Sequence, residues 1–123
     1  MADPRHELGR DAELAVAAWL TDAGWRILAR RWRVPEGELD LVCLDPDDTL
    51  VGVEVRARAS PRAGTPEESV GRRRVGRLRR ALGIYARASA TGARRLRIDL
   101  VSVGDRDPAG RWRLRRLPAI DAW

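Results

Sequence analysis

The chain has 123 residues, enough for a single domain with one hydrophobic core, and residues 1–123 are expected to form that domain. Its one cysteine, Cys43, excludes an internal disulfide and a multi-cysteine zinc site. No apolar run approaches the roughly 20 residues that a membrane span requires, and the N-terminus lacks the apolar segment of a signal peptide. We therefore expect a soluble, cytoplasmic protein without a membrane partner.

The net charge of +6 is unevenly distributed along the chain. All 24 basic residues are arginine; residues 1–55 hold 6 of them with 12 acids, whereas residues 56–97 hold 13 with only 2 acids. Divalent metal ions require carboxylates and phosphate backbones require cations, so this division suits a protein that binds both. A solvated basic helix is the alternative, and the charge run alone does not separate the two.

The first predicted element is an amphipathic helix over residues 5–23. Asp3 is its expected N-terminal cap, Pro4 suits the first turn, and Gly24 is the expected C-terminal cap. Its apolar positions recur at helical spacing and are Leu8, Ala12, Ala15, Val16, Trp19 and Leu20. This spacing predicts that one face of the helix packs on the core.

Three strands are predicted next, over residues 25–34, 38–44 and 50–58, because short runs of β-forming residues are separated by turn sequences. Their short connections predict a meander, in which each strand lies beside the next. The chain has no phenylalanine, so tryptophan is expected to fill core space. The tryptophans that fit core positions are Trp19, Trp25 and Trp32.

The second half of the chain is predicted to hold a basic helix over residues 67–88, a strand at 96–103, a turn at 105–110 and an edge strand at 112–117. The apolar stripe of this helix is Val70, Val75, Leu78, Ala81, Leu82 and Tyr85. The element order α-β-β-β-α-β, with a further β at the end, predicts an α/β fold. We expect a mixed central sheet flanked by helices.

Two of the predicted strands carry acids among apolar residues. In the second strand Glu38 and Asp40 share one face, and Leu39 and Leu41 share the other. Glu54 interrupts the apolar run of the third strand in the same way. Charges in such positions are costly unless they are paired or bind a metal ion. If the two strands are adjacent, Asp40 and Glu54 can approach each other.

A divalent cation relieves the repulsion between two close carboxylates, and hard oxygen ligands suit Mg²⁺ or Mn²⁺. Asp40 is followed, after thirteen residues, by Glu54, Val55 and Arg56. This spacing is close to the PD-(D/E)xK arrangement of the restriction-endonuclease-like superfamily. Taken alone, the triplet favours the simpler interpretation of a surface-facing strand with cross-strand ion pairs.

Several further sequence blocks lie between about residue 8 and residue 103, and Arg74 lies in the basic helix between the last two of them. The blocks are residues 9–13 (Gly-Arg-Asp-Ala-Glu), 24–33 (Gly-Trp-Arg-Ile-Leu-Ala-Arg-Arg-Trp-Arg), 37–42 (Gly-Glu-Leu-Asp-Leu-Val), 50–58 (Leu-Val-Gly-Val-Glu-Val-Arg-Ala-Arg), 69–70 (Ser-Val) and 97–103 (Arg-Ile-Asp-Leu-Val-Ser-Val). In these blocks the chain resembles the YraN family of bacterial proteins, an endonuclease-like family similar to Holliday-junction resolvases. The resemblance implies a restriction-endonuclease-like core with Asp40 and Glu54 as metal ligands.

The resemblance also implies roles for neighbouring residues, and Arg74 stands where that family usually has a lysine. Glu13 would complete the site as a third carboxylate or orient a water, and a solvated helix residue is an equal alternative. For Glu38 we favour pairing with an arginine. Arg56 stands where the family has its catalytic lysine. An arginine stays protonated, so Arg56 can neutralise charge on a phosphate but cannot act as a base.

Three functions remain open on this basis. The first is a Mg²⁺- or Mn²⁺-dependent endonuclease acting on DNA, with branched or single-stranded DNA as candidate substrates. The second is a nucleic-acid-binding module with a weakened active site, and the third is an Arg-rich domain that binds an acidic protein. A homodimer is left open, since junction resolution requires two cuts. The residues expected to contact the phosphate backbone are Arg58, Arg72, Arg73, Arg74 and Arg77.

Overall fold

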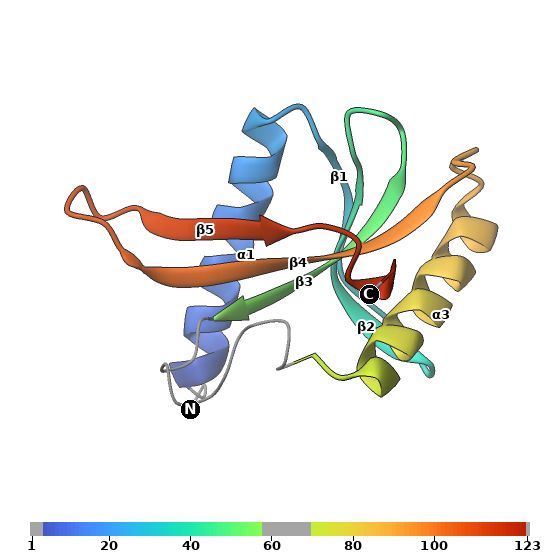
Figure 1. Cartoon of the computed structure of the whole chain (residues 1–123), viewed down its shortest axis with the longest axis horizontal. Helices are drawn as coiled ribbons and strands as arrows, with labels where there is room; N and C mark the ends of the chain where they lie inside the picture. Colours follow the sequence, from blue (N-terminus) through green and yellow to red (C-terminus); the bar gives the residue numbers. More distant parts are fainter. Residues whose placement is uncertain (1–3, 58–69, 123) are drawn as a thin grey trace.

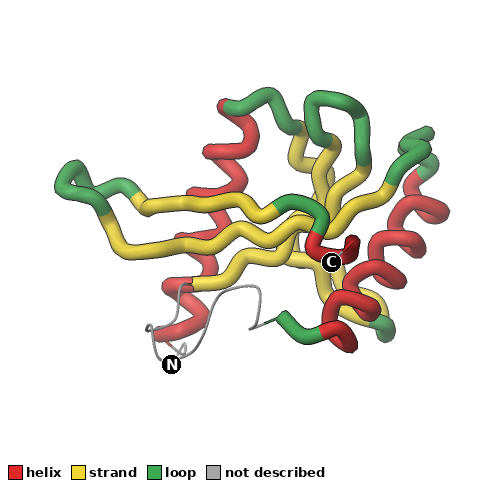
Figure 2. Tube along the Cα trace, viewed as in Figure 1, coloured by secondary structure: helices red, strands yellow, loops and turns green. Residues whose placement is uncertain are grey.

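A mixed β-sheet organises the part of the chain that the structure, a computed structural model, describes: residues 4–57 and 70–122, with side chains from residue 9 onward. Its elements are α1 (Pro4–Asp22), β1 (Arg26–Val34), β2 (Gly37–Leu44), β3 (Leu50–Ala57), α3 (Arg72–Ser89), β4 (Leu96–Arg106), β5 (Trp112–Leu117) and the short 3₁₀ helix η2 (Ile120–Ala122). Figures 1 and 2 show the strands between the two long helices. The predicted α/β class and element order are confirmed.

The described strands lie in the order β1-β2-β3-β4-β5. β1, β2 and β3 pair antiparallel, which confirms the predicted meander. β3 and β4 pair in parallel, so the chain must cross over between them, and α3 lies in this connection. β5 returns antiparallel to β4 and is the edge strand that the sequence predicted.

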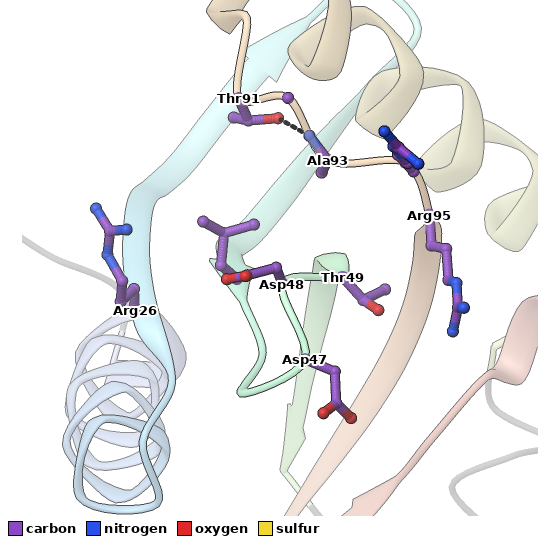
Figure 3. A pocket seen from close by; sticks show the side chains of 10 residues that line it. Arg26, Asp47, Asp48, Thr49, Thr91, Ala93 and Arg95 are labelled. Carbon is purple, nitrogen blue, oxygen red and sulfur yellow. Dashed lines mark hydrogen bonds between the residues drawn. The ribbon is translucent and has the colours of Figure 1, made fainter.

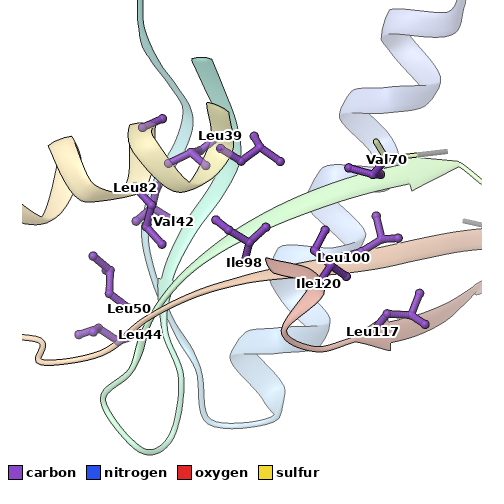
Figure 4. Packing of buried hydrophobic residues seen from close by; sticks show 12 residues of the cluster. Leu39, Val42, Leu44, Leu50, Val70, Leu82, Ile98, Leu100, Leu117 and Ile120 are labelled. Atoms are coloured by element: carbon purple, nitrogen blue, oxygen red, sulfur yellow. The ribbon is translucent and has the colours of Figure 1, made fainter. Parts of the chain in front are cut away.

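The two faces of the sheet carry separate hydrophobic clusters. Alternate residues of one strand point to opposite faces, and Leu50 enters one cluster whereas its neighbour Val51 enters the other. The first cluster includes Leu78 and Leu82 of α3, and Figure 4 shows it. The second cluster includes Val16 of α1. Each long helix therefore covers its own face of the sheet.

One of the three tryptophans predicted for the core lies elsewhere. Trp25 is buried, and Trp32 is half-buried with its ring edge against Tyr85, the two centroids 5.1 Å apart. Trp19 is 38% exposed, so its core assignment was wrong. The buried side of α1 includes Ala17, which places Trp19 toward the margin of the contact with the sheet.

Two predicted boundaries also differ. α3 starts at Arg72 and not at residue 67, because Gly71 has an extended backbone with φ −69° and ψ 164°; residues 67–69 lie outside the described part. β4 continues to Arg106, into the segment predicted as a turn. Arg106 pairs with Trp112 after an irregularity in the ladder, and its guanidinium lies 4.1 Å from the centre of the tryptophan ring.

None of the described helices combines the length and apolarity needed to cross a bilayer.

A buried carboxylate fastens the last strand to the sheet. Asp99 on β4 is fully buried and accepts hydrogen bonds from Arg97 at 2.7 and 3.0 Å, from Arg116 at 3.0 Å and from the backbone N–H of Ala119 at 2.9 Å. The guanidinium carbons of Arg97 and Arg116 lie 5.9 and 5.3 Å from the ring centre of Trp25. Because charged donors satisfy this carboxylate, it holds the base of the β4–β5 hairpin in place.

Candidate functional site

The ladder between β2 and β3 ends immediately before the two predicted metal ligands. Its last pair is Leu41 with Val53, so Asp40 and Glu54 are the next residues along the register. In place of a further ladder pair, Asp40 Oδ2 accepts a hydrogen bond from the backbone N–H of Val55 at 2.8 Å. The strands separate at this point, and the side chain of Asp40 satisfies the freed donor of β3.

The alternation of β2 breaks at the same residue. Leu39 packs in the cluster under α3, whereas Leu41 packs in the cluster under α1, so the prediction that they share a face was wrong. On the neighbouring strand, Arg31 lies opposite Asp40 between two regular pairs and has a φ of 49°. That backbone conformation is uncommon for a residue other than glycine and marks a local distortion. The distortion accompanies the turn of Asp40 toward β3.

Glu54 is a buried charge held by an arginine from α3. Its side chain is only 2% exposed, and its Oε1 accepts hydrogen bonds from Arg74 Nη2 at 2.8 Å and Arg74 Nε at 3.2 Å. Arg74 lies in the first turn of α3, which contains no acidic residue. Positive charge is unfavourable at a helix N-terminus, so the carboxylate of Glu54 compensates both the arginine and the helix dipole.

The second oxygen of Glu54 has no such compensation. Within the described residues, Oε2 is buried and has no hydrogen-bond partner. Arg56 Nε lies 3.2 Å from Oε1, but its direction does not make a hydrogen bond, and this nitrogen is likewise buried without a partner. A buried carboxylate oxygen without a donor is costly, and a cation is the kind of partner that removes the cost.

The neighbouring carboxyl titrates far from its ordinary range. Burial, followed by the negative charge of Glu54, raises the pKa of Asp40 to about 7. The hydrogen bond from Val55 and the positive charge of Arg74 oppose this rise. The two carboxylates therefore repel each other in a poorly solvated position, as two acids that share a site do.

Glu13 and Glu38 lie on the same side of the molecule but are paired with arginines. Glu13 Oε2 accepts a hydrogen bond from Arg31 Nε at 2.9 Å, and its charge also raises the pKa of Asp40. Arg33 Nη2 lies 3.0 Å from Glu38, which confirms the predicted arginine pairing of that residue. In the described ranges no three acidic, histidine or cysteine side chains form a metal-binding group. Glu13 is thus paired with Arg31, and its role as a third carboxylate stays a prediction.

The arginines predicted to contact phosphate divide into two groups. Arg72, Arg73 and Arg77 are exposed on the first half of α3, and Arg58 lies outside the described residues. Arg74, predicted with them, instead turns to Glu54. One sequence signal could have distinguished Arg74 from the other arginines of the helix: it occupies a position where the resembled family has a lysine.

Two cavities in the described part of the chain are lined by residues other than these carboxylates. The larger, about 700 Å³, lies at the opposite end of β3 and β4, where Asp47, Asp48, Arg26 and Arg95 line it (Figure 3). The other, about 290 Å³, lies along α3 beside Arg80.

The donor set at Asp40 and Glu54 fits a hard divalent cation. Both side chains offer only oxygen, both come from rigid strands, and one oxygen of Glu54 is unpartnered in the described structure. Mg²⁺ is commonly held by one or two carboxylates together with waters and substrate phosphate oxygens, so two protein ligands are sufficient.

The raised pKa of Asp40 makes the stability of the metal-free protein depend on pH. The folded carboxyl binds its proton more tightly than the unfolded one, whose pKa is roughly 4. Its contribution to stability is therefore complete below roughly pH 4 and is lost as the pH rises through about 7. Urea unfolding in EDTA should show this loss, at most about 1.4 kcal/mol per pH unit for one proton.

The variant Asp40→Asn should remove this component of the pH dependence. Asp47→Asn, in an exposed turn at the other end of the sheet, is the matched control and should keep it. An equal pH dependence in Asp40→Asn and the parent protein would contradict the assignment.

Removal of Arg74 should destabilise the protein through Glu54. Arg74→Ala is expected to lower the free energy of unfolding in EDTA by about 1–3 kcal/mol or more, since this is the range for an unsatisfied buried acceptor and a charged one costs more. The double variant Glu54→Gln/Arg74→Ala should cost less than the sum of the single variants, because the pair is removed together. Arg73→Ala, at the exposed neighbour, should change stability by less than about 0.5 kcal/mol. Additive effects of the two single variants would mean that the pair is not coupled.

Among solved structures, the fold is similar to that of Pyrococcus furiosus SfsA in complex with Ca²⁺. The TM-score is 0.40 and the sequence identity 16%, over 92% of this chain and 63% of that chain. A likeness of this degree says nothing about the ligand or activity of this chain.

Sequence relationships are much closer. The model of "Uncharacterised protein family UPF0102" matches residues 12–103. A UPF0102 protein of Anaeromyxobacter dehalogenans is 44% identical over 86% of this chain and 80% of its own length, and one of Moorella thermoacetica is 42% identical over 84% and 85%. A UPF0102 protein of an Arthrobacter species is 40% identical over 92% and 94%. The chain therefore belongs to the UPF0102 family, which is the YraN family that its sequence blocks indicated.

Proposed function

We propose that this protein is a Mg²⁺- or Mn²⁺-dependent endonuclease that binds DNA and hydrolyses its phosphodiester bonds. The observation that carries the proposal is the carboxylate pair of half-buried Asp40 and buried Glu54, with one Glu54 oxygen unpartnered in the described residues. The pair lies beside the arginine-rich first turn of α3. Acids that bind a cation next to exposed cations that bind phosphate are the two components that metal-dependent phosphodiester cleavage needs.

Asp40 and Glu54 would hold the metal ion. When bound, the ion supplies a water of lowered pKa and neutralises charge on the phosphoryl oxygens. The strands fix the two carboxylates, since the hydrogen bond from Val55 orients Asp40 and the interior encloses Glu54. Such fixed ligands need little reorganisation when the substrate arrives.

The two arginines at Glu54 have distinct positions and therefore distinct proposed roles. Arg56 stays protonated and cannot take a proton from water, so it would stabilise the negative charge that develops on the phosphate. Arg74 would hold Oε1 of Glu54 in place, which leaves the unpartnered Oε2 for the metal ion. Arg72, Arg73 and Arg77, exposed on α3, would bind the DNA backbone.

A second candidate function is supported by the arginine at position 56. Without a lysine or another neutral base beside the pair, the chain would bind DNA on a nuclease scaffold without cutting it. This alternative keeps the same DNA-binding surface and the same fold. It differs from the first only in the chemical step, so one set of reactions separates the two.

The test is a cleavage assay on duplex, single-stranded, flap and four-way-junction DNA with Mn²⁺, Mg²⁺ or EDTA. We expect metal-dependent cutting by the parent protein and a loss of at least about 100-fold in Glu54→Gln, since the variant removes a metal ligand. Glu36→Gln, at an exposed turn, is the matched control and should cut like the parent.

The variant Arg56→Lys separates the two candidate functions. If the parent binds DNA without cutting it and Arg56→Lys cuts it, the second function is supported. Cutting by the parent that survives in Glu54→Gln or in EDTA would contradict the metal site. A parent that binds none of these DNA forms at low salt would contradict both functions.

A further inference from the structure

The sheet face that carries Glu54 continues across β4 and β5. Arg56 on β3 pairs with Ser102 on β4, and Ser102 pairs in turn with Arg115 on β5. Residues that pair across neighbouring strands point to the same face of a sheet. Arg56 and Arg115 therefore belong to one row, and neighbouring strands about 4.8 Å apart place their backbones about 10 Å from each other.

Arg113 extends this row toward the tip of the hairpin. It lies two residues before Arg115 and so shares its face, and a Cβ on Gly104 would lie 3.5 Å from the Cβ of Arg113. β4 continues three residues beyond its last pair with β3, which is Ala57 with Val103. We call the segment from Val103 to Arg115 the hairpin arm. Figure 1 shows that it projects past the end of β3 at the left of the view, whereas α3 lies at the right.

The other face of the hairpin arm is already occupied. Trp112 and Leu114 pack against the cluster under α1, and Arg116 turns to the same side to bond buried Asp99 at 3.0 Å. The arm is thus anchored on one face by apolar contacts and a buried ion pair. Its arginines on the opposite face, Arg113 and Arg115, do not contribute to that anchoring.

These two arginines are available to a partner. Arg115 is exposed and has no ion-pair partner in the described residues. Arg113 lies 3.4 Å from Asp105, but the side chains are 61% and 83% exposed, and such surface pairs contribute little. Exposed, uncompensated guanidinium groups on a rigid strand are suited to phosphate oxygens.

We propose that the arginine face of the hairpin arm binds the backbone of duplex DNA that lies across Glu54, on the side opposite the first turn of α3. The inference rests on the proposed function and extends its DNA-binding surface from the first half of α3 to the hairpin arm. Duplex DNA carries one charge per about 1.7 Å of its axis, so a row about 10 Å wide spans several phosphates. Arg113 and Arg115 would fix the position of the strand relative to the carboxylate pair without reading its sequence.

The salt dependence of DNA binding tests the arm directly. A labelled duplex is titrated with Arg113→Gln/Arg115→Gln in EDTA at several NaCl concentrations, and the slope of log Kd against log salt is measured. Each lost phosphate contact lowers the magnitude of this slope by about 0.9, so the double variant should lower it by about 1.8.

Two further variants control for charge and for folding. Arg94→Gln/Arg95→Gln removes the same charge at exposed positions at the opposite end of β4 and should keep the parent slope. Arg113→Lys/Arg115→Lys keeps the charge and should restore most of the slope. Circular dichroism melts of all variants should match the parent, because none of these four side chains is buried.

The outcomes separate this inference from the proposed function. A parent protein that does not bind the duplex overturns the proposed function and the arm together. If the parent binds and the arm variant keeps its slope, the arm inference is overturned and the DNA-binding function stands. An equal fall in slope for the arm and the Arg94/Arg95 variants also overturns it, since the effect would then be one of net charge.

Discussion

The repulsion between two carboxylates at the point where β2 and β3 separate is the constraint on which the site depends. Asp40 and Glu54 are placed there by strands whose apolar residues fill both cores, so the strands fix where the two carboxylates lie. The raised pKa of Asp40 reports this repulsion together with burial. Arg74 offsets part of it by bonding one oxygen of Glu54, and the other oxygen stays without a donor in the described residues.

Much of this arrangement follows from sequence pattern. Asp40 and Glu54 interrupt apolar strand sequences, and short turns predict that the strands are neighbours, so their proximity was predictable. The opposite placement of Leu39 and Leu41 was not, because it depends on Asp40 leaving the regular ladder to take a backbone donor from β3. The contact of Arg74 with Glu54 was also hidden, because it depends on how the crossover places the first turn of α3. Local periodicity does not contain such tertiary geometry.

The two ends of the sheet differ in what they offer a ligand. At the end where β2 and β3 separate, Glu54 is buried beside half-buried Asp40, and arginines are exposed on α3 and on the hairpin arm. At the other end, Asp47 and Asp48 line an open cavity together with arginines. The end with Asp40 and Glu54 suits a metal ion and a polyanion bound side by side. The end with Asp47 and Asp48 has acidic and basic side chains mixed on one surface. The chain spans most of the length of its UPF0102 relatives, so the same test for a metal site at the carboxylate pair can be made on them.

Binding of Mn²⁺, followed through the loss of the free-ion signal in electron paramagnetic resonance, tests the central claim most directly because it requires neither DNA nor cleavage. We expect the parent protein to bind Mn²⁺, the variants Asp40→Asn and Glu54→Gln each to weaken binding by at least about tenfold, and Asp47→Asn/Asp48→Asn to bind like the parent. Equal binding by Glu54→Gln and the parent, or loss of binding only in the Asp47/Asp48 variant, would show that the carboxylate pair is not the metal site.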